Sequence, residues 1–347
     1  MSDKLVLERH LEIWAGTDEL RRAVASTVTA LAATCSDIAA TVAAGPLSGK
    51  LSAHLRDAIG GDVQTELDAR ANEVLIKALQ QAPVAAVASE EMDAPKILKP
   101  GAPVVVALDP LDGSSNIETN VSIGTIFSVL ATPSGGSGTE PAAFLRLGRE
   151  QIAAGYVIYG PQTALALTLG NGTDIFTLDP TGGQFVRTAT GVRLPPKARE
   201  FAINASNYRH WDLAVRTWFD DCLAGAEGPR GEDFNMRWIA SMVAEAHRIL
   251  ARGGVYFYPG DARPGFRSGR VRLIYEANPI AFLMEQAGGA ASTGHERILD
   301  RMPRLLHERI PLVFGASEEV ERIERYQFGA PPKGETSPLF ARRGLFV

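Results

Sequence analysis

Two carboxylates and a glycine–serine turn, all within eight residues, are the groups of this chain best suited to chemistry. Residues 109–116 read Asp-Pro-Leu-Asp-Gly-Ser-Ser-Asn and follow the apolar run Val104–Leu108, which predicts a buried strand. Asp109 and Asp112 would lie where that strand ends, and Mg²⁺ prefers such oxygen ligands. A phosphate could be cradled by the backbone N–H groups of Gly113, Ser114 and Ser115. The octet therefore predicts metal-assisted phosphate chemistry, against the alternative of a plain surface turn.

Three further acids follow predicted strands. Glu90 and Glu91 come directly after the run Ala85–Ala88, and Glu276 follows residues 272–275. Parallel strands can end side by side, and ligands bind at such strand ends. Clustered anions cost energy unless cations neutralise them. Two or three Mg²⁺ ions would do so, and would activate a water for in-line attack on phosphorus.

Length and charge narrow the class of protein. The chain has 347 residues, 45% of them hydrophobic and 22% charged, which is typical of a soluble protein with two domains or one large layered unit. A net charge of −5 argues against nucleic acid or an anionic membrane as partner. No apolar stretch is expected to reach the ~18–20 residues of a membrane span, and no signal peptide is apparent. We expect a cytoplasmic protein, with Cys35 and Cys222 too few for a disulfide framework or a zinc cluster.

Strand and helix patterns occur in both halves of the chain. Helices are predicted over residues 19–41, 68–80, 211–223, 236–251 and 279–287, the first capped by Thr17 or Asp18. Strands are predicted over residues 85–88, 104–108, 125–131, 155–159, 164–169, 174–178, 201–204, 255–258, 273–275 and 313–315, and the three between 155 and 178 predict an antiparallel meander. Prolines and charges near residues 191–199 indicate a boundary. Together, these helices and strands predict a layered α/β protein.

Several sequence blocks together resemble class I fructose-1,6-bisphosphatase. They are the octet, residues 120–127, 153–157 and 241–248, and residues 272–289, and the resemblance runs from about residue 15 to about residue 325. The Asp-Pro-Leu-Asp-Gly core alone marks the wider lithium-sensitive phosphatases, inositol monophosphatases included. The family implies an αβαβα sandwich of the sugar-phosphatase type, with two α/β domains and mixed sheets. The expected domains are residues 1–192 with the metal and phosphate motif, 193–326 with the sugar and 6-phosphate contacts and Glu276, and a C-terminal tail, 327–347.

The resemblance also implies roles for individual residues. The metal ligands would be Glu90, Glu91, Asp109, the Leu111 carbonyl, Asp112 and Glu276, holding two or three Mg²⁺ per subunit, for which Mn²⁺ can substitute. Asp68 and Glu73 match acids linked to activation of the attacking water, and Glu91 and Asp112 also count as catalytic. The 1-phosphate would be held by Asp112, Gly113, Ser114 and Ser115. The 6-phosphate would be held by Asn204, Tyr208, Arg237 and Tyr258, with Arg237 reaching into a neighbouring subunit of a homotetramer.

Three other positions are interpreted less simply. Met242 would lie beside the sugar, although an ordinary core methionine is an equal alternative. Arg270 stands where the family usually has a lysine near the sugar and the labile phosphate, and arginine does not simply replace lysine at such a site. Trp238 stands where a tyrosine usually contacts the 6-phosphate.

The implied activity is Mg²⁺-dependent hydrolysis of the 1-phosphate of D-fructose 1,6-bisphosphate, in gluconeogenesis or the Calvin cycle. Sedoheptulose 1,7-bisphosphatase, as sole or second activity, is the nearest alternative. An inositol-monophosphatase-like enzyme and a non-catalytic sugar-phosphate-binding regulator are the others. Regulation is expected to differ from that of AMP-inhibited members, because Pro103, Val104 and Ala131 replace a lysine, a tyrosine and an arginine that contact the nucleotide.

Overall fold

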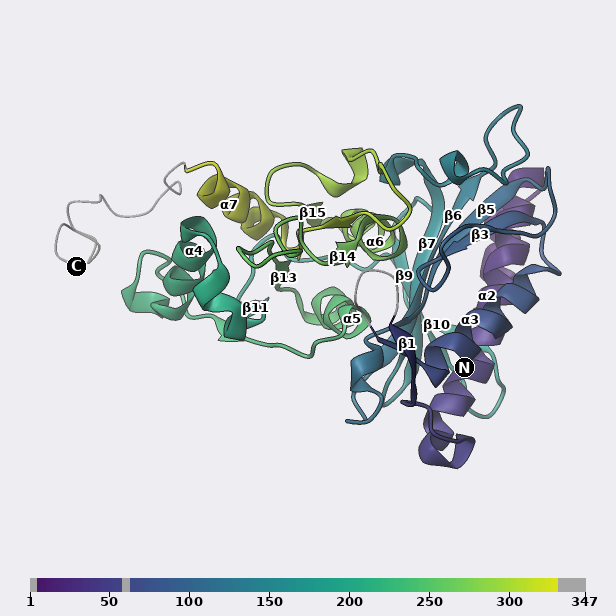
Figure 1. The fold of residues 1–347 in the computed structure, drawn as a ribbon, viewed down its shortest axis with the longest axis horizontal. Helices are drawn as coiled ribbons and strands as arrows, with labels where there is room; N and C mark the ends of the chain where they lie inside the picture. Colours follow the sequence, from purple (N-terminus) through teal and green to yellow (C-terminus); the bar gives the residue numbers. More distant parts are fainter. Residues whose placement is uncertain (1–4, 58–62, 330–347) are drawn as a thin grey trace.

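Five alternating layers of helices and sheets make up the protein. A computed structural model describes residues 5–57 and 63–329. In Figure 1 the layers run from α2 and α3 through the larger sheet, then α5 and α6, then a smaller sheet, to α4 and α7. The expected αβαβα sandwich is confirmed.

The larger sheet has eight strands in the order β10-β9-β8-β7-β6-β5-β3-β4. The bounds are β3 Val84–Ser89, β4 Lys96–Ile97, β5 Val104–Asp112, β6 Ile123–Ala131, β7 Gln151–Tyr159, β8 Thr163–Thr168, β9 Thr173–Leu178 and β10 Phe185–Ala189. Strands β7, β8 and β9 pair antiparallel, as the predicted meander requires. The one parallel pair that matters for the site is β3 with β5, where Ser89 lies opposite Leu108. The acids in the last part of β5 and those directly after β3 therefore lie at the same edge.

The second sheet has five strands in the order β12-β11-β13-β17-β15. They are β11 Glu200–Ala202, β12 Asn235–Met236, β13 Val255–Tyr258, β15 Ala290–Ser292 and β17 Leu312–Gly315. Two small ribbons accompany the sheets, one of β1 His54–Asp57 with β2 Val63–Thr65 and one of β14 Val271–Arg272 with β16 Arg309–Ile310.

Helices begin where the sequence supplies caps. The helices are α1 Leu7–Ala15, α2 Glu19–Ala44, α3 Glu66–Leu79, α4 Leu213–Leu223, α5 Met242–Arg252, α6 Asn278–Gln286 and α7 Ser317–Gln327. Asp18 accepts a hydrogen bond from the Arg21 N–H at the start of α2, as one of the two predicted caps. Ser241 accepts from the Ala244 N–H at the start of α5, so the first free N–H groups of both helices are satisfied.

Three of the four hydrophobic cores among the described residues follow directly from the layering. The first joins α1, α2 and α3 to one face of the large sheet. The second fills the space between the sheets around α5 and α6 and includes Ile126, Tyr156, Met242 and Phe314. The third lies beyond the small sheet, under α4 and α7, around Trp218 and Phe257.

Helix α2 corrects one expectation from the sequence. By length and hydropathy alone the segment Glu19–Ser48 could cross a membrane, so the chain does contain one stretch of that length. Its apolar side is nevertheless inside the protein, since Val28, Leu31 and Cys35 are fully buried in the first core. We read α2 as a core helix.

Two predicted elements are wrong in detail, and helix α7 was not predicted. Residues 236–241 are not helical, because Ala240 has φ 60° and Ser241 is extended, so α5 begins at Met242. Residues 273–275 are not a strand, because Leu273–Ala277 forms a π-helical turn that leads into α6. Helix α7 was not predicted because its sequence is mostly charged; Gln327, expected to begin a tail, ends this helix, and residues 330–347 lie outside the described residues.

Helix α7 is held by a buried ion pair to Arg230, in the loop after α4, and by a hydrogen bond from Trp218 of α4. Glu319 is 3% exposed and lies 2.5 Å from the Arg230 guanidinium, and the Trp218 indole N–H donates to it at 2.7 Å. Removing one partner of a buried pair leaves the other charge uncompensated.

We therefore expect Glu319→Ala to lower the free energy of unfolding by about 3–5 kcal/mol. Urea denaturation followed by tryptophan fluorescence measures this, because Trp218 lies in the network. The control is Glu318→Ala, which removes an exposed glutamate one residue away. Equal effects of the two substitutions would show that the buried pair does not stabilise α7.

Candidate active site

A cavity of about 710 Å³ opens between the large sheet and the C-terminal elements. Most of the predicted site residues line it. Those present are Asp68, Glu90, Glu91, Asp109, Leu111, Asp112, Gly113, Ser114, Ser115, Asn204, Met242, Tyr258, Arg270 and Glu276. Residues far apart in the sequence are thus brought to one place by the fold.

Three of the acids lie within reach of a single cation. Carboxylate oxygens of Asp109, Asp112 and Glu276 all lie within 4.8 Å of one another. Glu90 and Glu91 follow β3, the parallel neighbour of β5, and line the same cavity. Glu276 arrives from the π-helical turn and not, as expected, from the end of a strand.

A β-bulge in β5 turns Asp109 and Asp112 to the same side. In a regular strand, residues three apart point to opposite faces. Asp109 pairs with Ile126 whereas Asp112 pairs with Gly124, so β5 has one residue more than β6 in this interval. The extra residue shifts the alternation by one position. The Leu111 N–H donates to Asp109 Oδ1 at 3.0 Å and holds the bulge locally.

Each of the other acids is held by neighbouring donors. Glu90 accepts from Arg272 Nε at 3.0 Å, and Glu276 accepts from the Arg272 backbone N–H at 2.5 Å. Gln64 donates its side-chain amide to Glu91. Arg272 is 3% exposed, so it is a buried cation that fixes two acids at once.

Asp112 is tied to the beginning of α5. Its Oδ2 accepts from Ser241 Oγ at 3.1 Å and from the Val243 N–H at 2.9 Å. These bonds lower the pKa of Asp112, but burial raises it more, to about 6. The side chain is therefore oriented before any ligand arrives.

Burial and mutual repulsion favour the neutral forms of these acids. For both Asp109 and Glu276 burial raises the pKa well above its usual value, and the charge of Glu90 adds to the effect. Bound cations would reverse this balance by stabilising the carboxylates. Closely spaced oxygen donors whose repulsion a bound cation would relieve are suitable ligands for Mg²⁺.

The predicted phosphate cradle has the backbone shape that it needs. Gly113 has φ 78°, in the left-handed region that favours glycine, and a Cβ there would lie 3.0 Å from Ser241 Cβ. The short 3₁₀ helix Ser114–Asn116 follows. Asn116 Nδ2 donates to the Ala240 carbonyl at 3.1 Å, which fastens the turn to the segment before α5.

Three predicted site residues lie elsewhere. Glu73 is exposed on α3, and it does not line the cavity. Tyr208 also lies outside the lining, and its hydroxyl donates to Asp220 at 3.0 Å. Arg237 has a side chain 46% exposed, lies 3.5 Å from Glu200, and is not on the helix expected from the sequence.

Asp68 lines the cavity and also caps α3. Its Oδ2 accepts from the Thr65 N–H at 2.6 Å and from Thr65 Oγ1 at 2.7 Å, which completes the capping box of α3. Burial raises the pKa of Asp68 to about 6, against these hydrogen bonds.

Some residues that hold the site without forming it were not predicted. Arg272 stands in an otherwise apolar run, and a charged residue in such a run is a signal of a buried partner. Ser241 precedes an apolar helix in the manner of a cap. Trp238, which stacks on Tyr256 at 5.9 Å between ring centroids, lines the cavity too.

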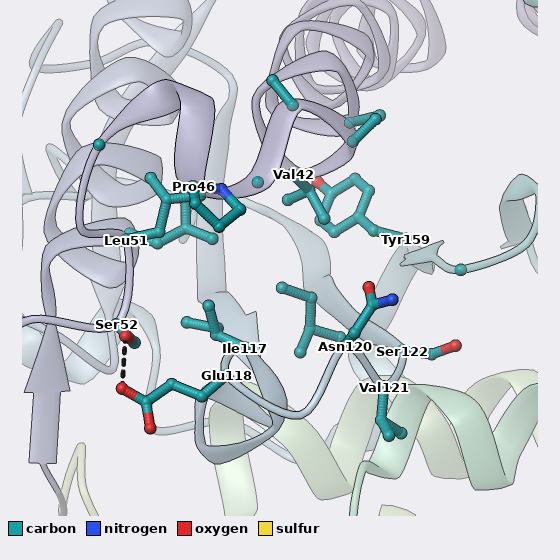
Figure 2. A pocket seen from close by; sticks show the side chains of 18 of the residues that line it. Val42, Pro46, Leu51, Ser52, Ile117, Glu118, Asn120, Val121, Ser122 and Tyr159 are labelled. Carbon is teal, nitrogen blue, oxygen red and sulfur yellow. Dashed lines mark hydrogen bonds between the residues drawn. The ribbon is translucent and has the colours of Figure 1, made fainter.

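A larger cavity of about 1410 Å³ adjoins this one. Figure 2 shows its mostly apolar wall, including Val42, Leu51 and Tyr159. Ser52 and Glu118 line both cavities, and Ser52 Oγ donates to Glu118 at 2.7 Å. The acid cluster lies in the smaller cavity, which is therefore the candidate active site.

Comparison with known proteins agrees with this geometry. The N-terminal domain model of fructose-1-6-bisphosphatase matches residues 2–190, and the C-terminal domain model matches residues 194–328. This chain belongs to the class 1 fructose-1,6-bisphosphatases.

Individual members of the family match over almost their whole length. A class 1 fructose-1,6-bisphosphatase of Xanthobacter autotrophicus is 55% identical over 97% of this chain and 91% of its own length. One from Nitrobacter hamburgensis is 53% identical over 100% of this chain and 99% of its own. The crystal structure of Leishmania major fructose-1,6-bisphosphatase in holo form has a TM-score of 0.87 at 31% identity, covering 94% of this chain and 99% of that one.

The repulsion among the crowded acids predicts how Glu276→Gln changes the thermal stability of the protein. The amide oxygen can still accept from the Arg272 N–H, but one negative charge is removed from the cluster. In EDTA we expect the melting temperature to rise, because repulsion is relieved. The rise that saturating Mg²⁺ gives the unaltered protein should be mostly lost.

Differential scanning calorimetry with and without Mg²⁺ measures both changes. The control is Glu321→Gln, whose side chain is 68% exposed on α7, and it should leave the Mg²⁺ response intact. An undiminished response of Glu276→Gln to Mg²⁺ would remove Glu276 from the proposed metal site.

Proposed function

We infer that the protein is a phosphoric monoester hydrolase that cleaves the 1-phosphate from D-fructose 1,6-bisphosphate, giving fructose 6-phosphate and phosphate. The observation that carries this is the convergence of the acids beside the Gly113 turn, in a chain of this family. A binding protein without catalysis would have no use for five carboxylates in one cavity, because their repulsion costs stability.

The metal ligands would be Glu90, Glu91, Asp109, the Leu111 carbonyl, Asp112 and Glu276, for two or three Mg²⁺ or Mn²⁺ ions. Bound there, such ions lower the pKa of water and offset charge on the leaving oxygen. The chain's own part is to fix the phosphate. The N–H groups of Gly113, Ser114 and Ser115 would bind its oxygens, and the rigid attachment of Asp112 to α5 keeps this end of the site in place.

The far end of the substrate would meet the C-terminal elements. Asn204, Tyr258 and Arg270 line the same cavity as the acids and suit a second phosphate. We propose that the exposed Arg237 serves the active site of a neighbouring subunit in a homotetramer, since its guanidinium lies outside the cavity of its own chain. Binding energy gained at the remote phosphate would then position the reacting one.

The cysteines and the reaction bear on the biological setting of the protein. Both cysteines are free and buried, which suits the reducing cytoplasm. Either gluconeogenesis or the Calvin cycle would use this reaction. Sedoheptulose 1,7-bisphosphate, one carbon longer, is the alternative substrate and is not favoured by the family.

Phosphate release from both bisphosphates tests the substrate assignment. We expect a higher kcat/KM for fructose 1,6-bisphosphate, activity that disappears with EDTA, and its return with Mg²⁺. Asp112→Asn should lower kcat about a hundred- to a thousandfold, since it removes a proposed ligand and deleting one group that acts on the transition state costs about that much. Its amide oxygen can still accept from Ser241 and Val243, so far-UV circular dichroism should not change; retained kcat would exclude the role given to Asp112.

The proposed absence of AMP control has a structural basis as well. Val104 and Ala131 face each other across β5 and β6, so the two replacements fall side by side, next to Pro103. Charged hydrogen bonds contribute roughly 1.5–3 kcal/mol each, and losing two would weaken AMP binding by about a hundredfold or more. Steady-state assays with AMP should show no inhibition at micromolar concentration, and half-inhibition in that range would refute this proposal.

A further inference from the structure

The bulge that aims the two aspartates lies directly opposite one buried threonine. Pro110 and Leu111, on β5, together face Thr125 on β6. Proline has no N–H to contribute to the ladder, and the local pairing is irregular. Something other than regular strand pairing must therefore hold this part of β5.

A hydrogen-bonded chain meets the bulge at this point. Thr125 is 0% exposed, and its Oγ1 lies 2.8 Å from the Pro110 carbonyl oxygen and 2.8 Å from Tyr159 Oη. A hydroxyl has one proton to donate. Thr125 gives it to the carbonyl, so the Tyr159 hydroxyl must donate to Thr125. The chain thus runs from Tyr159, in the wall of the larger cavity (Figure 2), to the backbone between the two aspartates.

We propose that Thr125 is a positioning residue for metal binding, which holds the Pro110 carbonyl so that the bulge keeps Asp109 and Asp112 on one side. Thr125 is not among the described residues that line the acid cavity, so it acts through the backbone. The inference rests on the proposed metal-dependent function and deepens it. Side chains that orient metal ligands typically change metal affinity or activity 10–100-fold when they are replaced.

Substitutions at Thr125 and Tyr159 can separate the effect of the Thr125 side-chain shape from the effect of its hydroxyl. Thr125→Val keeps the volume and the β-branch but leaves the carbonyl and the Tyr159 hydroxyl without their shared partner. Thr125→Ser keeps the hydroxyl and loses a methyl group. Tyr159→Phe keeps the bond to Pro110 and removes the hydroxyl that donates to Thr125, together with its contact with Cys35.

A matched control exists in β9. Thr173 is also 0% exposed in a strand of the same sheet, and its Oγ1 donates to the Leu283 carbonyl at 2.8 Å. Thr173→Val therefore removes a buried hydroxyl of the same kind away from the acids. It should reproduce any general loss of stability.

The experiment measures Mg²⁺ binding by isothermal titration calorimetry without substrate, and then kcat and the Mg²⁺ concentration for half-maximal phosphate release. For Thr125→Val we expect Mg²⁺ affinity to fall about 10–100-fold, with kcat lowered in step. For Thr125→Ser and Thr173→Val we expect affinity close to that of the unaltered protein. For Tyr159→Phe we expect a smaller loss in the same direction as Thr125→Val.

Unchanged Mg²⁺ affinity in Thr125→Val would overturn the inference, as would an equal loss in Thr173→Val. If Thr125→Val does not fold, Thr125→Ser and Tyr159→Phe together test the inference. A role for the hydroxyl would be contradicted by wild-type Mg²⁺ affinity in Tyr159→Phe combined with a large loss of affinity in Thr125→Ser. Binding is read without a sugar, so an error in the substrate would leave this result standing. Failure of the unaltered protein to bind Mg²⁺ would instead remove the proposed function.

Discussion

The burial of like charges in one cavity is the constraint on which the site depends. Asp109, Asp112 and Glu276 crowd within 4.8 Å of one another, and burial raises the pKa of Asp109 and Glu276 well above their usual values. Such a group does not hold itself together, since each acid is repelled by the others. Its geometry must come from contacts outside the cluster, chiefly the buried Arg272, whose guanidinium binds Glu90 and whose N–H binds Glu276.

A second set of contacts joins the large sheet to α5. Asp112 accepts from Ser241 and Val243, and Asn116 donates to the Ala240 carbonyl. Gly113 is packed so closely that an added Cβ would meet Ser241. The proposed phosphate cradle therefore lies against the N-terminal end of a helix, where the peptide dipoles favour negative charge. These bonds tie the Gly113 turn to the beginning of α5.

The sequence could predict the site residues that lie on regular strands, but not the placement of those that depend on an irregular backbone. The apolar run before Asp109 predicted a strand, and its parallel pairing with β3 followed from ordinary rules. The bulge and the π-helical turn at Glu276 were not predictable, because both are departures from a regular period that only tertiary contacts stabilise. Glu73 is different: five residues after Asp68 on a helix, it points about 140° away, so its exposure could have been inferred from spacing alone.

Arg270 illustrates how a replacement at a proposed phosphate site can be accommodated locally. The resemblance implied a lysine there, a compact charge on a flexible stem, whereas arginine carries a planar fork that must be oriented to be useful. The Arg270 guanidinium carbon lies 4.7 Å from the centroid of the Phe266 ring, and a guanidinium stacks well on an aromatic face. The ring limits the orientations open to the fork and reduces the entropy lost when a phosphate binds. A change that looks unfavourable in isolation is thus supported by an aromatic residue four positions earlier in the chain.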